Sequence, residues 1–190
     1  MSNQISQQPL VPVELEFEWY PSNQVDVSNA YLANWLLDTG SLTERLQSMC
    51  RRFRVEVLFH APMSAPLCGD DDTNYLREVI LWGDDTPWVF ARSIIPAALN
   101  NGELLDLGEQ PLGQRIFNDE RFVRSQFEMC QVNSEALCKQ LPAKVTAAVK
   151  RSKCANVGPL FGRRSAFHFL EHRLSVAEIF LPLAPAYSRG

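Results

Sequence analysis

The sequence lacks the features that would place the protein in a membrane or outside the cell. No apolar run approaches the ~18 residues that a membrane-spanning helix needs. The first residues contain no basic region followed by an apolar one, so we expect no signal peptide. The five cysteines are odd in number and none stands in a Cys-x-x-Cys pair, which disfavours a disulfide framework or a zinc knuckle. We therefore predict a soluble cytoplasmic protein with free thiols and no stable membrane insertion.

The common nucleotide and hydrolase motifs are absent too. There is no Gly-x-Gly-x-x-Gly, no Walker loop and no Gly-x-Ser-x-Gly elbow. His168 and His172 stand four residues apart, as two metal ligands on one helix would. The alternation around Phe167 and Phe169 instead favours a strand that turns at this point. We predict no metal site.

The composition is that of one soluble domain. The chain has 190 residues, of which 46% are hydrophobic and 21% are charged. A net charge of −4 disfavours nucleic acid as the main partner. Residues 134–156 differ, because they carry five basic residues and one acidic residue. We predict a flexible segment at 1–12 and a single domain over 13–190. Its basic segment is interpreted as a solvated surface insertion or as a docking surface for an acidic partner or membrane.

Local patterns predict a mixed α+β chain. Alternating apolar residues predict strands at 13–20, 53–59, 123–131, 164–169 and 173–181. Asp26 or Ser28 could cap a helix that carries Trp35. Ser41, with a glutamate three places later, forms a capping box, so a second helix is expected through about Arg51.

Residues 74–96 predict a β-hairpin, with two runs of β-branched and aromatic residues around the breakers of 83–87. Alternation puts Arg77 on a face with Tyr75, Val79 and Leu81. A guanidinium stays protonated, so one surrounded by apolar side chains needs an anion from the protein or from a ligand.

The register of this hairpin decides where Arg92 lies. If Asp84 and Asp85 form a two-residue turn, Arg77 lies opposite Arg92, and the two cations need an anion between them. If the turn is one residue longer, Arg92 faces Glu78 and forms a cross-strand salt bridge. The sequence leaves both open, and we favour the first.

Glu178 is the acidic counterpart near the C-terminus. Alternation places it with Leu174, Val176 and Phe180 on an apolar face. A carboxylate there must be paired, hydrogen-bonded or held partly neutral. Glu178 could pair with an arginine (Arg77, Arg163 or Arg164) and do no chemistry, or it could serve a site.

Four blocks of sequence resemble the chorismate pyruvate-lyase family, whose members open the bacterial ubiquinone pathway. The central block comprises Tyr75–Leu81, Pro87–Arg92 and Ile94–Pro96. The other blocks follow the family order: Asn34–Leu37 through Ser41–Thr43, then Pro111–Gly113 with Ile116–Phe117, then Phe161–Ser165 with Glu178–Pro182. The resemblance covers about Tyr31 to Tyr187 and rests on the order of the blocks. The basic segment at 134–156 departs from the family pattern.

The resemblance implies an α+β fold with a six-stranded antiparallel sheet, helices packed on one side and an enclosed ligand cavity under flap loops. It implies that Arg77 holds the ring carboxylate of chorismate or 4-hydroxybenzoate in a bidentate contact. Backbone groups at Leu42 and Leu112 would complete this site. Glu178 would contact the ring hydroxyl, and Arg92 the enolpyruvyl carboxylate.

The implied activity removes enolpyruvyl from chorismate as pyruvate and leaves 4-hydroxybenzoate. Aromatisation drives this reaction, so the resemblance implies no metal or redox cofactor. Arg77 and Glu178 are the expected catalytic residues, with Glu178 positioning the hydroxyl and relaying a proton. A product gripped beneath flaps should leave slowly and inhibit the enzyme. We expect a monomer.

Two alternatives remain. Effector domains of GntR-type regulators share this general fold and bind small ligands without catalysis. They follow a helix-turn-helix region, and only about 30 residues precede the matched part here, which favours the lyase. A lyase-like protein without activity that sequesters aromatic acids is the other alternative.

Overall fold

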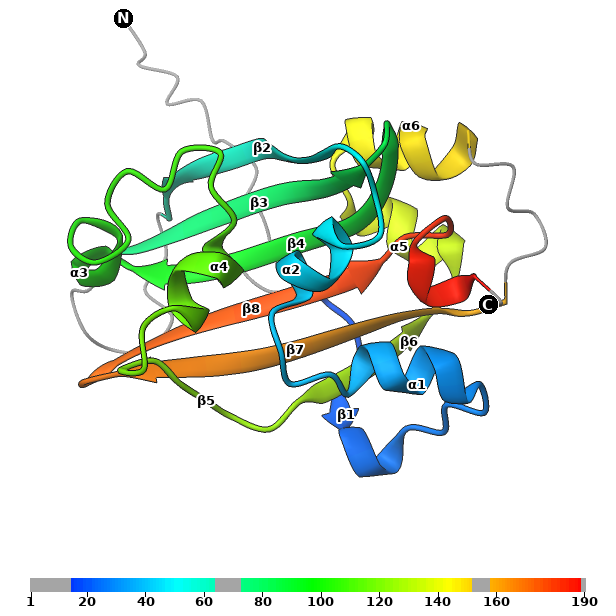
Figure 1. Cartoon of the computed structure of the whole chain (residues 1–190), viewed down its shortest axis with the longest axis horizontal. Helices are drawn as coiled ribbons and strands as arrows, with labels where there is room; N and C mark the ends of the chain where they lie inside the picture. Colours follow the sequence, from blue (N-terminus) through cyan, green and yellow to red (C-terminus); the bar gives the residue numbers. More distant parts are fainter. Residues whose placement is uncertain (1–14, 64–72, 152–157, 189–190) are drawn as a thin grey trace, which may run out of the picture.

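An antiparallel sheet of eight strands forms the centre of the computed structural model, which describes residues 15–63, 73–151 and 158–188 (Figure 1). The strand order is β1-β6-β7-β8-β4-β3-β2, and β5 pairs with β7. The strands are β1 (Tyr20–Pro21), β2 (Phe53–Pro62), β3 (Asn74–Gly83), β4 (Thr86–Pro96), β5 (Val123–Arg124), β6 (Glu128–Val132), β7 (Leu160–Phe169) and β8 (His172–Phe180). The α+β class is confirmed. The expected number of six strands is wrong, because two-residue strands β1 and β5 extend the sheet.

Helices cover both faces of this sheet, not one as expected. One face carries α1, α2 and α4, and the other carries α5 and α6 (Figure 1). The helices are α1 (Ala30–Leu36), α2 (Leu42–Gln47), α3 (Ala97–Asn100), α4 (Leu112–Phe117), α5 (Ser134–Gln140) and α6 (Ala143–Arg151), with short 3-10 turns η1 (Ser22–Gln24) and η2 (Pro185–Tyr187). Among the described residues, no helix has the length and apolar character to cross a membrane.

Capping side chains fix where the first two helices begin. Asn29, rather than Asp26 or Ser28, caps α1, and its Oδ1 accepts from the amides of Tyr31 and Leu32. The capping serine of α2 is confirmed, since Ser41 Oγ accepts from the amide of the third helical residue at 3.3 Å. That helix ends at Gln47, earlier than expected.

Several of the expected strands change in extent, and the one expected at 53–59 continues to Pro62 as β2. Of the strand expected at 13–20, the described part forms only β1, and residues 15–19 are irregular. The strand expected at 123–131 divides into β5 and β6. The terminal pair is confirmed: β7 begins earlier than expected, at Leu160, and β8 spans His172–Phe180, shifted by one residue from the expected range. Residues 1–12, the segment expected to be flexible, lie outside the described residues.

A bulge near the turn sets the register of the β3–β4 hairpin. Asp84 and Asp85 form the two-residue turn with φ of 47° and 73°, the left-handed pair that a type I′ turn requires. Leu81 then pairs with Val89 while Trp82 pairs with Pro87, which leaves Trp88 as an extra residue.

The expectation that Arg77 faces Arg92 is therefore wrong: Arg77 faces Ser93, and Arg92 faces Glu78. The bulge has a physical cause. Pro87 has no N–H to give to a ladder, and proline inside a sheet is confined to edges and bulges. The ring of Trp88 lies over Gly83, where a Cβ would overlap it.

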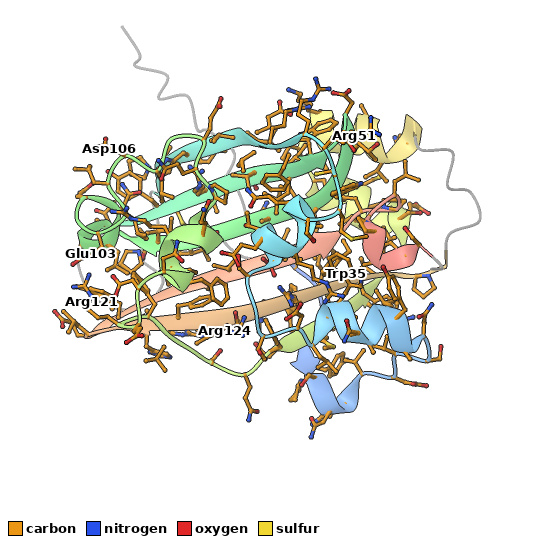
Figure 2. All side chains as sticks on the ribbon, in the orientation of Figure 1. Trp35, Arg51, Glu103, Asp106, Arg121 and Arg124 are labelled. Carbon is orange, nitrogen blue, oxygen red and sulfur yellow. The ribbon has the colours of Figure 1, made fainter. Side chains whose placement is uncertain are left out.

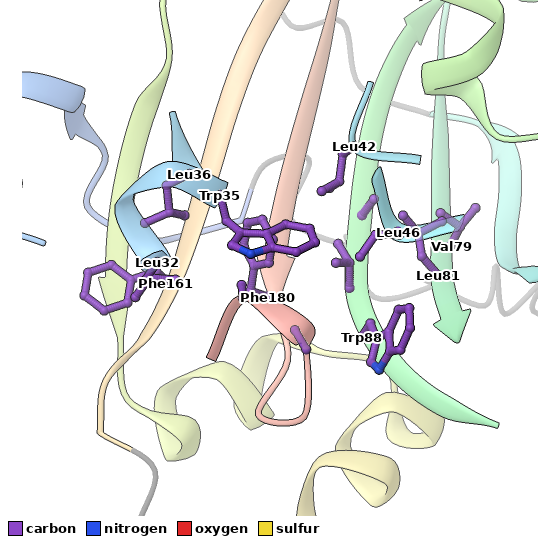
Figure 3. Close-up of a cluster of buried hydrophobic side chains, with 14 of the residues drawn as sticks. Leu32, Trp35, Leu36, Leu42, Leu46, Val79, Leu81, Trp88, Phe161 and Phe180 are labelled. Atoms are coloured by element: carbon purple, nitrogen blue, oxygen red, sulfur yellow. The ribbon is translucent and has the colours of Figure 1, made fainter. Parts of the chain in front are cut away.

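The main core fills the space between the sheet and the helices α1 and α2 (Figure 3). Trp35 and Phe180 meet edge to face with centroids 6.4 Å apart. Aliphatic residues of both layers surround them: Leu32, Leu36, Leu42, Leu46, Val79 and Leu81.

A second cluster lies on the other face of the sheet. The basic segment supplies four of its buried residues: Leu137, Leu141, Val145 and Val149. The described part of this segment is thus a core layer with a basic outer side.

Candidate functional site

A pocket of about 50 Å³ lies between the sheet and the helices α2 and α4. Four of the residues expected in a site line it, from four different elements: Leu42, Arg77, Leu112 and Glu178. Its other walls are Thr43, Val55, Val79, Leu81, Ala91, Ser93, Pro111, Gly113, Ile116, Phe117 and Val176.

The strand register explains why Arg77 and Glu178 share this pocket. Residues directly opposite each other on neighbouring strands point to the same face. Arg77 faces Ser93 of β4, and in the next row of the sheet Ala91 of β4 faces Glu178 of β8. The side chains of Ala91 and Ser93 are small, so space remains above β4 between the cation and the acid.

Arg77 is a buried cation whose side chain has hydrogen-bonding capacity left over. The residue is 2% exposed, and its Nη2 donates to the carbonyls of Gly108 at 2.9 Å and Gln110 at 3.2 Å. Within the described ranges, its Nη1 has no hydrogen-bond partner, and no carboxylate pairs with it. Burial lowers the pKa of Arg77 from its ordinary value. A buried, uncompensated guanidinium indicates a place for an anion.

Glu178 is paired with an arginine of the neighbouring strand. Its Oε2 accepts from Arg163 Nε at 2.7 Å. Of the three partners that the sequence allowed, this is the one observed. Arg164 instead bonds Glu128. The Glu178 side chain keeps 19% exposure and still lines the pocket, so the ion pair does not remove it from the site.

The first residues of α2 and α4 are among those that line the pocket. The first amides of any helix have no acceptor within that helix. Leu42 is the first residue of α2, after its cap Ser41. Leu112 is the first residue of α4, and its N-cap residue Pro111 makes no side-chain capping bond. Both residues line the same pocket as Arg77, and their backbone N–H groups have no acceptor within their own helices.

Arg92 is not part of this arrangement. Because of the bulge it lies on the opposite face of the sheet, where its Nε and Nη2 bond Glu78 Oε1 at 2.9 and 2.7 Å. There it lines a different pocket of about 80 Å³, together with Arg164 and Arg173. The expected contact of Arg92 with the enolpyruvyl carboxylate is inconsistent with this placement.

Three polar residues of the site were not predicted to belong to it. Ser93 and Thr43 line the pocket, and Arg163 holds Glu178. The true register of the hairpin would have identified Ser93, because it stands opposite Arg77. Arg163 carried a weaker signal, as one of three candidate partners of Glu178.

The described part of the chain contains no group of three or more His, Cys, Asp or Glu residues that could hold a metal ion. His168 and His172 belong to the paired strands β7 and β8, in which His168 faces Arg173 and His172 faces Phe169.

Comparison with known proteins shows the family of the chain. The family model described as chorismate lyase matches residues 15–190. The chain belongs to the chorismate lyase family. A probable chorismate pyruvate-lyase of Pseudoalteromonas atlantica is 40% identical over 183 residues, covering 89% of this chain and 88% of that protein. One of Shewanella amazonensis is 40% identical over 179 residues, with 90% and 91% covered.

Solved structures with a similar fold include regulatory proteins. The effector domain of PhnF from Mycobacterium smegmatis matches with a TM-score of 0.50 at 15% identity, covering 77% of this chain and 91% of that chain. A Staphylococcus aureus gene product matches with a TM-score of 0.50 at 14% identity, covering 75% and 88%. At such low identity these matches show a shared fold and nothing about activity.

Proposed function

We propose that this protein is a chorismate pyruvate-lyase that converts chorismate to 4-hydroxybenzoate and pyruvate. Family membership supports the reaction. The observation that carries the proposal within the site is the Nη1 of Arg77, which has no hydrogen-bond partner among the described residues and belongs to a buried cation in the same pocket as Glu178. An aromatic acid brings the carboxylate that this cation needs and a hydroxyl on the far side of its ring.

In this proposal Arg77 and the two helix starts hold the ring carboxylate. The Nη1 of Arg77 donates one charge-assisted hydrogen bond. The backbone amides of Leu42 and Leu112 add donors from α2 and α4, and the Ser93 hydroxyl stands opposite Arg77. Arg92 has no role here, because it lies on the other face of the sheet and bonds Glu78.

Glu178 serves the reacting end of the ring. The bond between the ring carbon and the ether oxygen of the enolpyruvyl group breaks. The neighbouring ring carbon, which bears the hydroxyl, loses its hydrogen as a proton. Loss of this proton makes the ring aromatic. An equivalent proton is added to the methylene carbon of the released enolpyruvate, which becomes pyruvate. Glu178 orients the hydroxyl and relays the proton. The reaction is redox neutral, and we propose that it proceeds without a cofactor.

The pocket must open for this chemistry. Ligand pockets usually measure roughly 300–1,000 Å³, whereas this one measures about 50 Å³. We propose that α2 and α4, with the segments before them, act as flaps that move apart to admit chorismate and close into an enclosed cavity. Release of 4-hydroxybenzoate then requires reopening, so we expect slow release and product inhibition. We propose that the reaction belongs to ubiquinone biosynthesis and takes place in the cytoplasm.

Incubation of the purified protein with chorismate tests the proposal. We expect 4-hydroxybenzoate and pyruvate in equal amounts, separated and quantified by chromatography, with turnover falling as 4-hydroxybenzoate is added. Binding of 4-hydroxybenzoate without any turnover would instead identify a protein that sequesters aromatic acids or senses them as a regulator domain does. Absence of both binding and turnover would refute an aromatic-acid site altogether.

A further inference from the structure

The connection between α1 and α2, residues 37–41, is held by an arginine from the sheet. Arg163 is 2% exposed, and its Nη1 donates to three carbonyls at the end of α1: Trp35 at 3.1 Å, Leu36 at 3.4 Å and Asp38 at 2.8 Å. The last carbonyls of a helix lack donors within it, and a nearby cation satisfies them. Arg163 therefore fixes the end of α1 on β7.

The same guanidinium also fixes Glu178. Its Nε donates to Glu178 Oε2 at 2.7 Å, and its Cζ lies 4.6 Å from the centroid of the Phe127 ring. One rigid, planar group thus bonds a pocket carboxylate on one side and backbone carbonyls on the other. Lysine could not reproduce this, because its ammonium has no planar fork.

A second arginine adds to the hold on this connection. Arg124 of β5, labelled in Figure 2, donates from its Nη2 to the carbonyl of Thr39. The connection leads directly into Ser41 and Leu42, the start of α2. The position of this helix start beside the pocket is consequently tied to the side chain that holds Glu178.

We propose that Arg163 is a positioning residue that orients the Glu178 carboxylate and couples it to the α1–α2 connection, so that the acid is aligned only when this flap is closed. This inference rests on the proposed function, which it deepens. Arg163 is not among the residues that line the pocket, and in this proposal it acts through Glu178 and through the backbone of the connection.

The test compares Arg163→Lys with Arg164→Lys. Arg164 is the neighbouring residue, of the same type, and its Nε also bonds a glutamate at 2.7 Å, but that glutamate is Glu128. For Arg163→Lys we expect kcat to fall by up to about 100-fold, the effect of small misplacements near a reacting centre, with KM changed by less than about threefold. Arg164→Lys should keep both constants within about twofold of wild type.

Hydrogen exchange provides a readout independent of turnover. Amides of residues 37–42 should exchange faster in Arg163→Lys than in wild type. In Arg164→Lys their exchange rates should equal those of wild type. Addition of 4-hydroxybenzoate should slow this exchange in wild type and slow it less in Arg163→Lys. Equal exchange in the two variants would overturn the coupling.

A double variant keeps the inference falsifiable if Arg163→Lys folds poorly. Arg163→Gln in a Glu178→Gln background removes both charges, and its kcat should lie within about threefold of Glu178→Gln alone, because residues that act as a unit are not additive. A further large loss would show that Arg163 does not act through Glu178. Wild-type protein without 4-hydroxybenzoate production would refute the proposed function. An active wild type with equal kcat in the two lysine variants would refute this inference alone.

Discussion

Arg77 and Arg92 are buried arginines on neighbouring strands, and they differ in whether a carboxylate of the protein pairs with them. Arg92 is neutralised within the protein by Glu78, whereas no carboxylate among the described residues pairs with Arg77. A buried charge left without its counterion is costly. The protein tolerates that cost at Arg77, where an anionic ligand would remove it.

Replacement of each arginine by methionine should separate the two roles. Arg77→Met should abolish binding of 4-hydroxybenzoate while keeping the free energy of unfolding within about 1 kcal/mol of wild type, since the lost bonds to carbonyls offset the removed charge. Arg92→Met should cost about 3–5 kcal/mol, because it leaves the buried Glu78 carboxylate without the arginine that pairs with it, and should preserve affinity in the folded protein. Calorimetric titration and urea unfolding measure both quantities.

Glu178 is expected to act in the chemical step more than in binding. Glu178→Gln keeps an acceptor for Arg163 but cannot relay a proton. We expect kcat to fall by about 100-fold or more, as for loss of a general acid or base, with a small change in KM. Steady-state kinetics measure both, and Glu128→Gln, outside the pocket, is the matched control. A change confined to KM would assign Glu178 to binding only.

At the scale of elements, the β3–β4 hairpin decides which residues meet in the site. Its bulge turns Trp88 into the core and moves Arg92 to the face away from the pocket. The close approach of the Trp88 ring to Gly83 is part of this arrangement, because a Cβ at Gly83 would overlap the ring.

Gly83→Ala should therefore destabilise the fold. We expect a loss of about 1–3 kcal/mol, the usual cost of overpacking, because the displaced ring belongs to the main core. Gly158→Ala is the control, since a Cβ there meets no atom of the described residues within 4 Å, and it should stay within about 0.5 kcal/mol of wild type. Equal unfolding midpoints in urea would show that the bulge does not depend on this contact.

The α1–α2 connection contains an acid that links its stability to pH. Burial raises the pKa of Asp38, but the Gly40 amide and Arg45 outweigh this and hold the pKa below its ordinary value of 3.8. The folded state then binds fewer protons than the unfolded state, so this stabilisation is present above about pH 4 and is lost as the pH falls through the lowered pKa.

Asp38→Asn should reduce the acid sensitivity of the protein. The drop in the free energy of unfolding between pH 6 and pH 3 should be smaller than in wild type. The difference should be below about 1 kcal/mol, because the carboxylate is a third exposed and water screens its ion pair. Urea unfolding at the two pH values measures this difference. If the free energy of unfolding fell equally in Asp38→Asn and in wild type, Asp38 would not be a source of the acid sensitivity.

At the scale of the whole molecule, the sheet lies between two helical layers of different character. The layer of α1, α2 and α4 covers the pocket, while α5 and α6 close the other face. Leu137 of α5 has no exposed surface, whereas Lys139 on the same helix lies outward and pairs with Glu135.

Leu137→Ala should destabilise the whole protein by about 2–5 kcal/mol, the cost of a large-to-small change in a core. Lys139→Ala should stay within about 0.5 kcal/mol of wild type. The comparison by urea unfolding distinguishes a structural layer from a dispensable insertion, for which the two variants would behave alike.

The sequence by itself determined what depends on a few neighbouring residues. The capping serine of α2 and the alternation of the long strands are local signals, and the structure confirms both. The two-residue turn at Asp84–Asp85 was the favoured one of two alternatives, and it is the one observed. The order of four short blocks was enough to indicate the family. It also drew attention to Arg77 and Glu178, which the structure brings to one pocket.

Only the tertiary structure decided which charges meet. A single extra residue at Trp88 exchanged the partner of Arg92, because one step of register moves a side chain to the other face. Arg163, rather than Arg77 or Arg164, holds Glu178 because of the β7–β8 register, and α5 packs on the back of the sheet because of its buried leucine. These outcomes depend on packing between segments distant in sequence, which local propensities do not encode.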